Sequence, residues 1–429
     1  MRILFIHPNM PGQYKHLARI FAEDPANEVV FITKPKPDVD IPNVKKISYK
    51  ASREASFETH RYLVNFERGI FQGQEVWRVC KKLKEQGFTP DVICAHPGWG
   101  DGLFLKEIYP DSPLLNFQEF FYGTPGGDMN FLPDDLTGID DMARIKIKNA
   151  VNLYSINYCD WGITPTFWQQ KQYPKEFHTK MSVLHDGIDT DKVRPMEWKT
   201  FKIGNMPRIP EMKFGDEIIT YISRNFEPYR GFPTFIEAAD IILKKRPKAR
   251  IIAIGADDVS YGKKREDGKP WRHYYIDKIK PDMSRLHFVG YLPYDEMLKV
   301  LQISSAHIYL TVPFVLSWSL LEAMSAGCAM VASRTPPVME AIEHGKNGLL
   351  ADFFSPQDVV DKIEQILDSP DRMQNMRAAA RQTVVDRYDL KKLLPMHLAL
   401  IRDVASKQLP PPAAKTIEEF HNHTMKIAA

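Results

Sequence analysis

The sequence lacks several features that would assign it to particular classes of protein. Its 429 residues include only four cysteines and no C-x-x-C pair; the four are Cys80, Cys94, Cys159 and Cys328. This scarcity argues against a disulfide framework or a zinc site and favours buried thiols in a reducing compartment. No apolar run approaches the roughly 18 residues of a membrane span, and the opening "MRILFIHPNMPG" lacks the apolar stretch of a signal peptide. We therefore predict a cytoplasmic protein, and peripheral attachment at the inner face of a membrane stays open.

An excess of charge of one sign is also missing. Lysine and arginine number 57 against 54 aspartates and glutamates, which gives a net charge of +3, so nucleic acid is not an expected partner. Neither the dinucleotide fingerprint G-x-G-x-x-G nor the phosphate-binding G-x-x-x-x-G-K-[ST] occurs. Their absence argues against a nicotinamide-dependent dehydrogenase and a P-loop nucleotidase.

The sequence does contain two successive series of short apolar strands with helical patterns between them. The strands of the first series are Ile3–His7, Glu28–Thr33, Asp91–His96, Pro113–Phe117, Trp161–Pro165 and Met181–Gly187. Those of the second are Ile218–Ser223, Arg250–Gly255, Leu286–Gly290, Ala306–Val312, Ala329–Ser333 and Gly348–Ala351. Strands that alternate with helices predict parallel sheets covered on both faces.

We therefore predict an α/β protein of two Rossmann-like, doubly wound domains that face a central cleft. Residues 1–195 form the first domain and residues 196–390 the second. Residues 391–429 supply a helix that crosses back to the first domain and then a polar tail. The closing helix is predicted at Val385–Ser406, kinked by Pro395. A plain terminal helix on the second domain is the alternative.

Candidate site residues follow the strands, because open α/β sheets bind ligands at the carboxyl ends of their strands. In "YISRNFEPYRGF", Arg224 ends a strand and Arg230 precedes a helix. Two guanidiniums there suit a diphosphate, and two solvated surface arginines are the alternative. Gly12, in the turn after the first strand, either lets the backbone approach a phosphate or sugar or serves the turn alone.

One acid stands alone in a stretch that otherwise resembles a core. Glu322 is the only charge in "FVLSWSLLEAMSAGCAMVA". Burying an unpaired acid costs several kcal/mol, roughly, so this carboxylate needs a partner. The partner is either a group of the protein, such as backbone N–H or a basic side chain, or a ligand.

Several segments in order resemble the family-4 (group 1) retaining glycosyltransferases of the GT-B fold. They include "YISRNFEPYRGF", "LHFVGYLPYDEM" and "EAIEHGKNGLLADFFSPQ". The resemblance implies that Arg224 and Arg230 hold the diphosphate of the donor and that the turn Val289–Gly290–Tyr291 contacts its base. It also implies that Glu322, the second glutamate of an E-x7-E motif, binds the ribose hydroxyls. The lone acid would then have a ligand diol as its partner.

The chain departs from the family pattern at the other end of that motif. Phe314 stands where the family has its first glutamate, which contacts hydroxyls of the donor sugar. Val315, Leu316 and Ser317 replace a glycine-rich segment whose backbone N–H groups hold sugar and phosphate. Backbone donors survive such a change and a carboxylate does not. A deoxy or otherwise modified sugar, or a carboxylate from elsewhere, would reconcile the difference.

The first domain offers further candidates for contact with acceptor or donor sugar. His96 closes a strand at a Pro/Gly turn, and Glu119 falls where many family members carry an active-site histidine. A hydrogen-bonded turn histidine and a surface glutamate are the alternatives. His7 is ambiguous, and His185 is interpreted as structural.

The resemblance implies a retaining transfer of a sugar from a nucleotide-diphosphate sugar to a hydroxyl of a glycan or a lipid-linked acceptor. It implies no cofactor and no metal, because arginines and helix N-termini neutralise the diphosphate. Two alternatives stay open: another GT-B enzyme, such as a nucleotide-sugar epimerase or a phosphorylase, and a non-catalytic protein that binds nucleotide sugars.

Overall fold

The computed structural model describes residues 1–408 apart from 37–38, 124–125, 134–137, 199, 205, 207–208 and 214. The chain forms two compact units. Unit 1 comprises Met1–Asn130, Asp135–Gly187 and Lys391–Ala429, and unit 2 comprises Phe131–Asp134 and Ile188–Leu390. Each contains a parallel sheet with helices, which confirms the predicted α/β class. The predicted polar tail lies almost wholly outside the described residues.

Unit 1 is built on a seven-stranded parallel sheet in the order β3-β2-β1-β4-β5-β6-β7. The strands are β1 (Arg2–Ile6), β2 (Glu28–Thr33), β3 (Val44–Ser48), β4 (Val92–Ala95), β5 (Leu114–Phe117), β6 (Trp161–Thr164) and β7 (Met181–Val183). The helices are α1 (Lys15–Glu23), α2 (Val64–Glu85), α3 (Leu105–Ile108), α4 (Ile139–Lys148), α5 (Ala150–Tyr158), α6 (Phe167–Gln172) and α14 (Leu390–Ala405). Helices α1 and α14 pack on one face of the sheet, and α2, α3 and α5 pack on the other.

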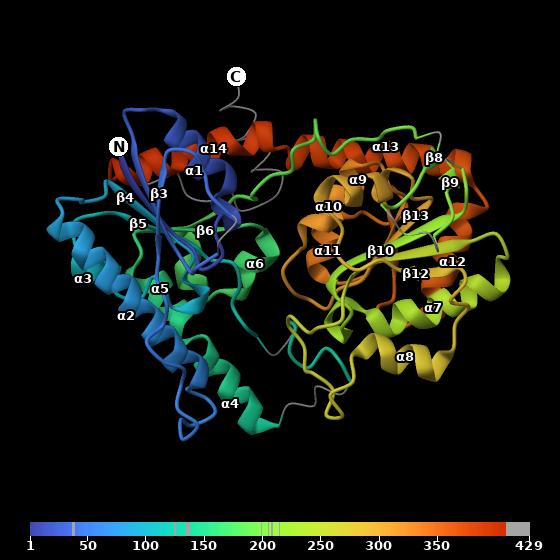
Figure 1. Ribbon diagram of the computed structural model, residues 1–429, viewed down its shortest axis with the longest axis horizontal. Coiled ribbons are helices and arrows are strands. Elements are labelled where there is room, and N and C mark those ends of the chain that lie inside the picture. Colours follow the sequence, from blue (N-terminus) through green and yellow to red (C-terminus); the bar gives the residue numbers. More distant parts are fainter. Residues whose placement is uncertain are drawn as a thin grey trace. The chain divides into compact units, whose positions relative to one another are not determined.

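Unit 2 is built on a six-stranded parallel sheet in the order β12-β11-β10-β13-β14-β15. The strands are β10 (Ile218–Asn225), β11 (Arg250–Ala256), β12 (Leu286–Phe288), β13 (Ala306–Tyr309), β14 (Met330–Ser333) and β15 (Leu349–Ala351). The helices are α7 (Phe232–Lys245), α8 (Trp271–Ile279), α9 (Tyr294–Gln302), α10 (Trp318–Ser325), α11 (Pro336–Ala341), α12 (Pro356–Leu367) and α13 (Pro370–Arg387). Helices α9, α10, α11 and α13 cover one face (Figure 1).

The predicted start of the closing helix is wrong. One helix ends at Arg387 and α14 begins at Leu390, so the expected helix over Val385–Ser406 is broken. The interruption has a long-range cause: Ile188 N–H donates to the Tyr388 carbonyl at 2.7 Å, and Leu390 N–H donates to the Ile188 carbonyl at 2.9 Å. These two bonds need extended backbone at Asp389, where the isolated bridge to Ile188 forms.

Helix α14 belongs to unit 1 apart from its first residue, and Pro395 lies inside it. Leu393, Leu400 and Ile401 join the same apolar cluster as strand β1. His397, buried on this helix, contacts the carbonyl of His185 through Nε2 at 3.0 Å. Within the described part of the chain, none of the helices combines the length and the apolar character that a bilayer crossing requires.

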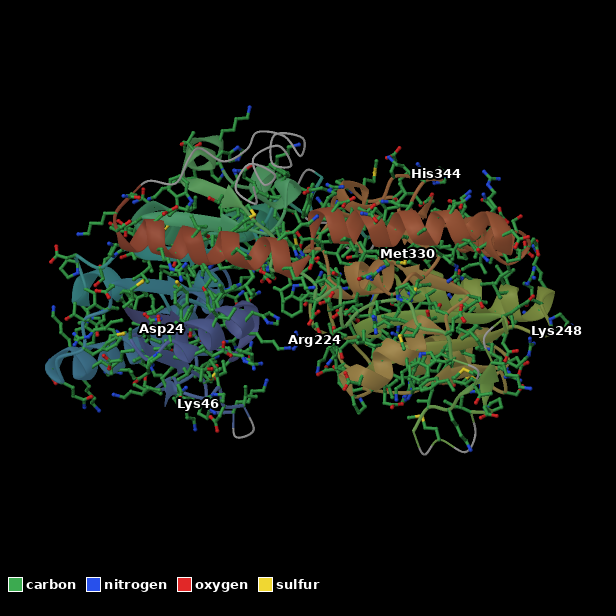
Figure 2. All side chains as sticks on the ribbon, turned by 90° about the horizontal axis from the view of Figure 1, so that it is seen from above. Asp24, Lys46, Arg224, Lys248, Met330 and His344 are labelled. Carbon is green, nitrogen blue, oxygen red and sulfur yellow. The ribbon has the colours of Figure 1, made fainter. Side chains whose placement is uncertain are left out.

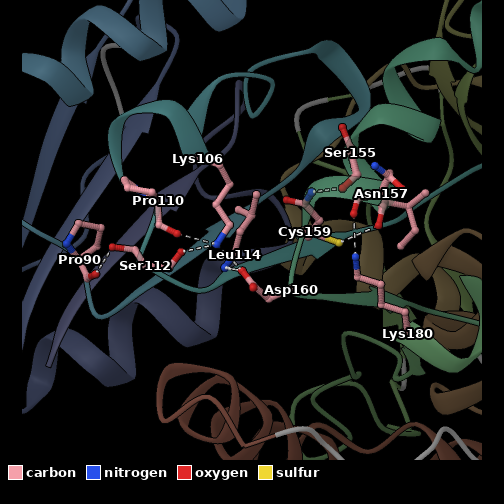
Figure 3. Close-up of polar contacts among 12 residues, drawn as sticks. Pro90, Lys106, Pro110, Ser112, Leu114, Ser155, Asn157, Cys159, Asp160 and Lys180 are labelled. Carbon is pink, nitrogen blue, oxygen red and sulfur yellow. Dashed lines mark hydrogen bonds and ion pairs between the residues drawn. The ribbon is translucent and has the colours of Figure 1, made fainter.

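Polar contacts hold the amino-terminal ends of β5 and β6, whereas the candidate residues follow the carboxyl-terminal ends of strands (Figure 3). Lys106 Nζ lies 2.7 Å from Asp160 Oδ2, and the same oxygen accepts from Leu114 N–H at 2.7 Å. Ser112 Oγ donates to the Pro90 carbonyl at 2.7 Å. These contacts satisfy backbone groups that strand pairing leaves over, and they fix this edge structurally.

Candidate functional site

Each sheet has a switch point, where successive strands are added in opposite directions. It lies between β1 and β4 in unit 1 and between β10 and β13 in unit 2. Open parallel sheets bind ligands beyond the carboxyl ends of the two strands at such a point. Candidate residues follow all four strands: His7 follows β1, His96 follows β4, Arg230 follows β10 and Phe314 follows β13.

Arg230 is held in a short turn between β10 and α7. The 3₁₀ turn Pro228–Arg230 ends at Gly231, whose φ of 65° favours glycine. A Cβ on Gly231 would lie 2.4 Å from the Cβ of Leu310. The Arg230 side chain is only 8% exposed, and its Nη1 donates to Thr311 Oγ1 at 2.8 Å. The turn therefore places a buried cation beside a neutral hydroxyl at the switch point.

Aromatic rings and hydroxyls surround the same guanidinium. Its Cζ lies 5.1 Å from the ring centre of Tyr261 and 5.9 Å from that of Phe314. Burial lowers the pKa of Arg230, but Tyr309, Tyr261 and Glu227 together outweigh burial and hold that pKa above its ordinary value. The guanidinium consequently keeps its charge throughout the physiological range.

Glu227 holds the loop that carries Tyr261. Its side chain is fully buried and accepts three backbone N–H groups, from Ser260 at 3.0 Å, Tyr261 at 3.1 Å and Gly262 at 2.8 Å. Hydrogen bonds to a charged acceptor contribute roughly 1.5–3 kcal/mol each, so this carboxylate is a strong anchor. Reasoning from the sequence missed Glu227, because its partners lie more than thirty residues away.

The segment between β13 and α10 is folded onto Tyr309. Ser317 N–H donates to Tyr309 Oη at 3.0 Å, and Ser317 Oγ caps α10 by accepting from Ser319 N–H at 3.3 Å. Phe314 and Leu316 are buried, and Val315 is partly buried. Of the backbone donors expected in Val315–Ser317, the Ser317 amide is therefore already engaged within the protein.

Glu322 lies on α10 and is partly buried. The hydroxyl of Tyr294 donates to its Oε1 at 2.7 Å. Burial raises the pKa of that hydroxyl, and the Glu322 charge raises it further. The lone acid thus has a tyrosine partner that the sequence did not single out; contact with a ligand diol stays a prediction.

Arg224 lies one residue before the end of β10, and its side chain is exposed (Figure 2). Its carbonyl accepts from the hydroxyl of Tyr291 at 3.0 Å. Tyr291 belongs to the predicted base-contacting turn, where the Gly290 carbonyl accepts from Gly255 N–H at 3.1 Å and Val289 N–H donates to the Ala253 carbonyl at 3.0 Å. The turn and Arg224 therefore lie at the same edge of the sheet.

In unit 1, His7 and His96 meet at the switch point with ring centres 5.0 Å apart. Nδ1 of His7 accepts from Asn9 N–H at 2.9 Å, and Nδ1 of His96 accepts from Gly98 N–H at 3.3 Å. Both imidazoles therefore carry hydrogen on Nε2 when neutral. Burial, and then the neighbouring His96, lowers the pKa of His7 to about 3, so His7 is neutral at physiological pH.

Glu119 completes this histidine cluster. Its Oε2 lies 3.5 Å from His96 Nε2, and its Oε1 accepts from Gln13 Nε2 at 3.2 Å. The Glu119 side chain is 31% exposed, whereas that of His96 is 2% exposed. Gly12 has a φ of 50°, and a Cβ there would lie 2.6 Å from His7 Nε2. A glycine is therefore required at position 12 because the ring of His7 packs too closely for a Cβ atom.

Aspartates that lie close together in the sequence could suggest a metal site, but several of them bind other groups of the protein. Asp189 caps a turn by accepting from Lys192 N–H at 3.0 Å, Asp257 pairs with Arg272, and Asp258 lies 3.0 Å from Lys264 Nζ. Among the residues that the structure describes, no group of three or more His, Cys, Asp or Glu side chains is arranged to hold a metal ion.

Comparison with known proteins adds two family matches. Residues 25–193 match the model described as "Glycosyl transferase family 4 group", and residues 208–383 match "Glycosyl transferases group 1". Among curated proteins, the chain is 27% identical over 120 residues to N-acetyl-alpha-D-glucosaminyl L-malate synthase of Bacillus anthracis, covering 28% of this chain and 31% of that protein. It is 24% identical over 284 residues to an uncharacterised glycosyltransferase of Methanocaldococcus jannaschii, covering 66% of this chain and 62% of that protein. The chain therefore spans less than two thirds of the length of both relatives.

Solved structures with the same fold cover nearly the whole chain. A sucrose-phosphate synthase from Thermosynechococcus elongatus has a TM-score of 0.67 at 14% identity and covers 95% of this chain and 100% of its own. Anabaena HepE in complex with UDP and glucose has a TM-score of 0.64 at 16% identity and covers 94% of this chain and 100% of its own. At such identities the likeness shows the fold, which is the two-domain GT-B fold that the sequence predicted.

Proposed function

We propose that this chain, which belongs to the family 4, group 1 glycosyltransferases, moves a sugar from a nucleotide-diphosphate sugar to an acceptor hydroxyl with retention of the anomeric configuration. The enzyme class follows from the family. The type of donor, the type of acceptor and the stereochemistry are the substance of the proposal. A glycan or a lipid-linked saccharide is the acceptor class that we favour.

The observation that carries the proposal is the environment of Arg230. A guanidinium with 8% exposure, placed at a switch point against Thr311 and two aromatic rings, lies where such sheets receive ligands. The Glu227 carboxylate, which also acts on it electrostatically, is occupied by three N–H groups. Buried charge is costly unless it is compensated, and a diphosphate supplies two anionic groups for bidentate contact.

The proposed reaction needs charge compensation more than it needs a protein nucleophile. The bond between the anomeric carbon and the phosphate oxygen breaks, and the acceptor oxygen bonds to that carbon on the same face. The acceptor proton passes to the departing diphosphate. Arg230 and Arg224 stabilise the negative charge that develops there, and Glu322, oriented by Tyr294 at 2.7 Å, holds the ribose hydroxyls.

The histidine cluster of unit 1 suits hydroxyl recognition. Glu119 offers a partly exposed carboxylate; its Oε1 accepts from Gln13 Nε2 at 3.2 Å, and a carboxylate has further acceptor capacity for hydroxyls. We assign this cluster to sugar hydroxyls of the acceptor. Cytoplasmic location, membrane attachment and independence of a metal stay predictions.

The test is turnover of a panel of nucleotide sugars, with and without saccharide acceptors. We expect nucleoside diphosphate release that depends on acceptor, with retained configuration of the product by NMR. Arg230→Met keeps an unbranched apolar stem and removes the charge, and it should lower kcat by about a hundredfold or more without lowering Tm. Lys244→Met, which removes an exposed cation from the next helix, is the matched control. Near-normal turnover of Arg230→Met would refute the diphosphate assignment.

A further inference from the structure

The ring that occupies the position of the expected glutamate is part of an aromatic group. Phe314 lies 4.9 Å from Tyr261 and 6.0 Å from Tyr229 between ring centres. Phe314 and Tyr229 are 7% and 6% exposed, whereas Tyr261 is 39% exposed. Tyr261 is thus the ring of this group that is open to a ligand, and Phe314 supports it from within.

Contacts within unit 2 give these rings a place relative to Arg230. The Tyr261 and Phe314 rings lie on one side of the guanidinium. Tyr309, which also interacts with the guanidinium, accepts from Ser317 N–H at the start of α10. Helix α10 then carries Glu322. Arg230 therefore has two kinds of neighbour: the rings, and, through Tyr309, the start of the helix that carries the acid.

In a nucleotide-diphosphate sugar the diphosphate lies between the ribose and the sugar, so a residue that binds the diphosphate has both as neighbours. If Arg230 binds the diphosphate and Glu322 the ribose, the group beyond the diphosphate meets the rings. The Tyr261 backbone is fixed by Glu227, so the exposed ring is presented by a held loop. A preorganised aromatic surface recognises its ligand at low conformational cost.

We propose that Tyr261, supported by Phe314, is a specificity-determining residue that stacks against the sugar ring of the donor. The inference rests on the proposed function and adds the way in which the sugar is selected. An aromatic face binds the C–H face of a sugar and offers no carboxylate to its hydroxyls. Sites that hydrogen-bond a hydroxyl reject analogues that lack it by roughly 10⁴–10⁵, whereas apolar sites discriminate by only about 10²-fold. The donor class is therefore a sugar chosen by its apolar face, and deoxy sugars are accepted.

The first test separates the sugar's contribution from that of the nucleotide. Kd is measured by calorimetry for UDP, GDP and ADP and for UDP-glucose, GDP-mannose, ADP-glucose and dTDP-rhamnose. We then compare the nucleotide sugar that binds with its own nucleoside diphosphate. Tyr261→Ala should weaken binding of the nucleotide sugar by about tenfold and binding of the free diphosphate by less than about threefold. Tyr261→Phe keeps the ring and should retain most of the affinity that the sugar adds to that of the diphosphate. Because Glu227 contacts the backbone of this loop, we expect the variants to fold, which their Tm checks.

The second test restores the missing carboxylate. Phe314→Glu should raise the preference for the parent donor over its 3-, 4- and 6-deoxy analogues, measured as kcat/KM, whereas Phe314→Leu should not. An equal loss of sugar and diphosphate affinity in Tyr261→Ala, or strong wild-type rejection of every deoxy analogue, would overturn this inference alone. Absence of binding and turnover with all nucleotide sugars would overturn the proposed function and this inference together.

Discussion

Asp101 gives a pH dependence of stability whose sign and size follow from its burial. The residue is fully buried in the loop after β4, and among the described residues neither carboxylate oxygen has a hydrogen-bond partner on another residue. Burial raises its pKa to about 7, although the charge of Lys34 acts in the opposite direction. The folded unit therefore binds the proton more tightly than the unfolded chain, whose carboxyl has the ordinary pKa of 3.8.

The stability that protonated Asp101 confers is complete below about pH 4 and is lost as the pH rises to about 7. Between pH 5 and pH 8 the loss is about 3 kcal/mol, at roughly 1.4 kcal/mol for each pH unit up to the folded pKa. Asp101→Asn keeps the shape of the protonated form and does not titrate. Its stability relative to the wild type should therefore increase by about 3 kcal/mol from pH 5 to pH 8.

The assay is urea unfolding at several pH values. Hydrogen exchange of peptides from β4 is the readout, because it reports on unit 1. Asp111→Asn, an exposed aspartate of the same unit, is the control and should show no such trend. A difference between Asp101→Asn and the wild type that stays constant from pH 5 to pH 8 would refute the argument. It would mean that the carboxyl is ionised in the fold at all these values.

Three further predictions concern unit 2. Glu227→Gln removes the charge that accepts three N–H groups and should expose the amides of residues 260–262 to rapid exchange; wild-type protection there would contradict the anchor. Tyr294→Phe removes the hydroxyl that donates to Glu322 and should raise the KM for the donor several-fold with little change in kcat, and an unchanged KM would count against a ribose role. Gly231→Ala adds a Cβ 2.4 Å from that of Leu310 at a φ of 65°, so the unfolding free energy should fall by about 2 kcal/mol or more, as urea unfolding would measure; full wild-type stability would show that the turn can relax.

The strands could be predicted because parallel strands buried on both faces are short apolar runs. The run "EVVFIT" is strand β2 with the bounds expected. Strand β3 was missed because "VKKIS" is an edge strand with only partly buried side chains and two lysines. The pair β8 (Thr200–Phe201) and β9 (Met212–Lys213) was missed because two-residue strands leave no periodic pattern.

The candidate site was predictable only where a residue belongs to a motif. Arg230 and Glu322 were singled out as candidates because their spacing and neighbours are local features of the sequence. Their partners were not: Tyr294 is 28 residues from Glu322, and Thr311 is 81 residues from Arg230. Such pairings depend on which strands are neighbours in the sheet. From a single sequence, the presence of strands is easier to predict than their order in the sheet.

Stability alone gives no reason for the arrangement around Arg230. A buried guanidinium beside a hydroxyl and two rings loses its hydration, and an apolar side chain of similar length would avoid that cost. The structure nevertheless fixes the surroundings of this charge with a buried carboxylate, Glu227, that holds the Tyr261 loop. His7 of unit 1 differs, because burial lowers its pKa and keeps it neutral, which removes the same cost. A charge kept where an apolar side chain would fit suits the anion of the proposed donor, and the sugar of that donor would meet the ring of Tyr261.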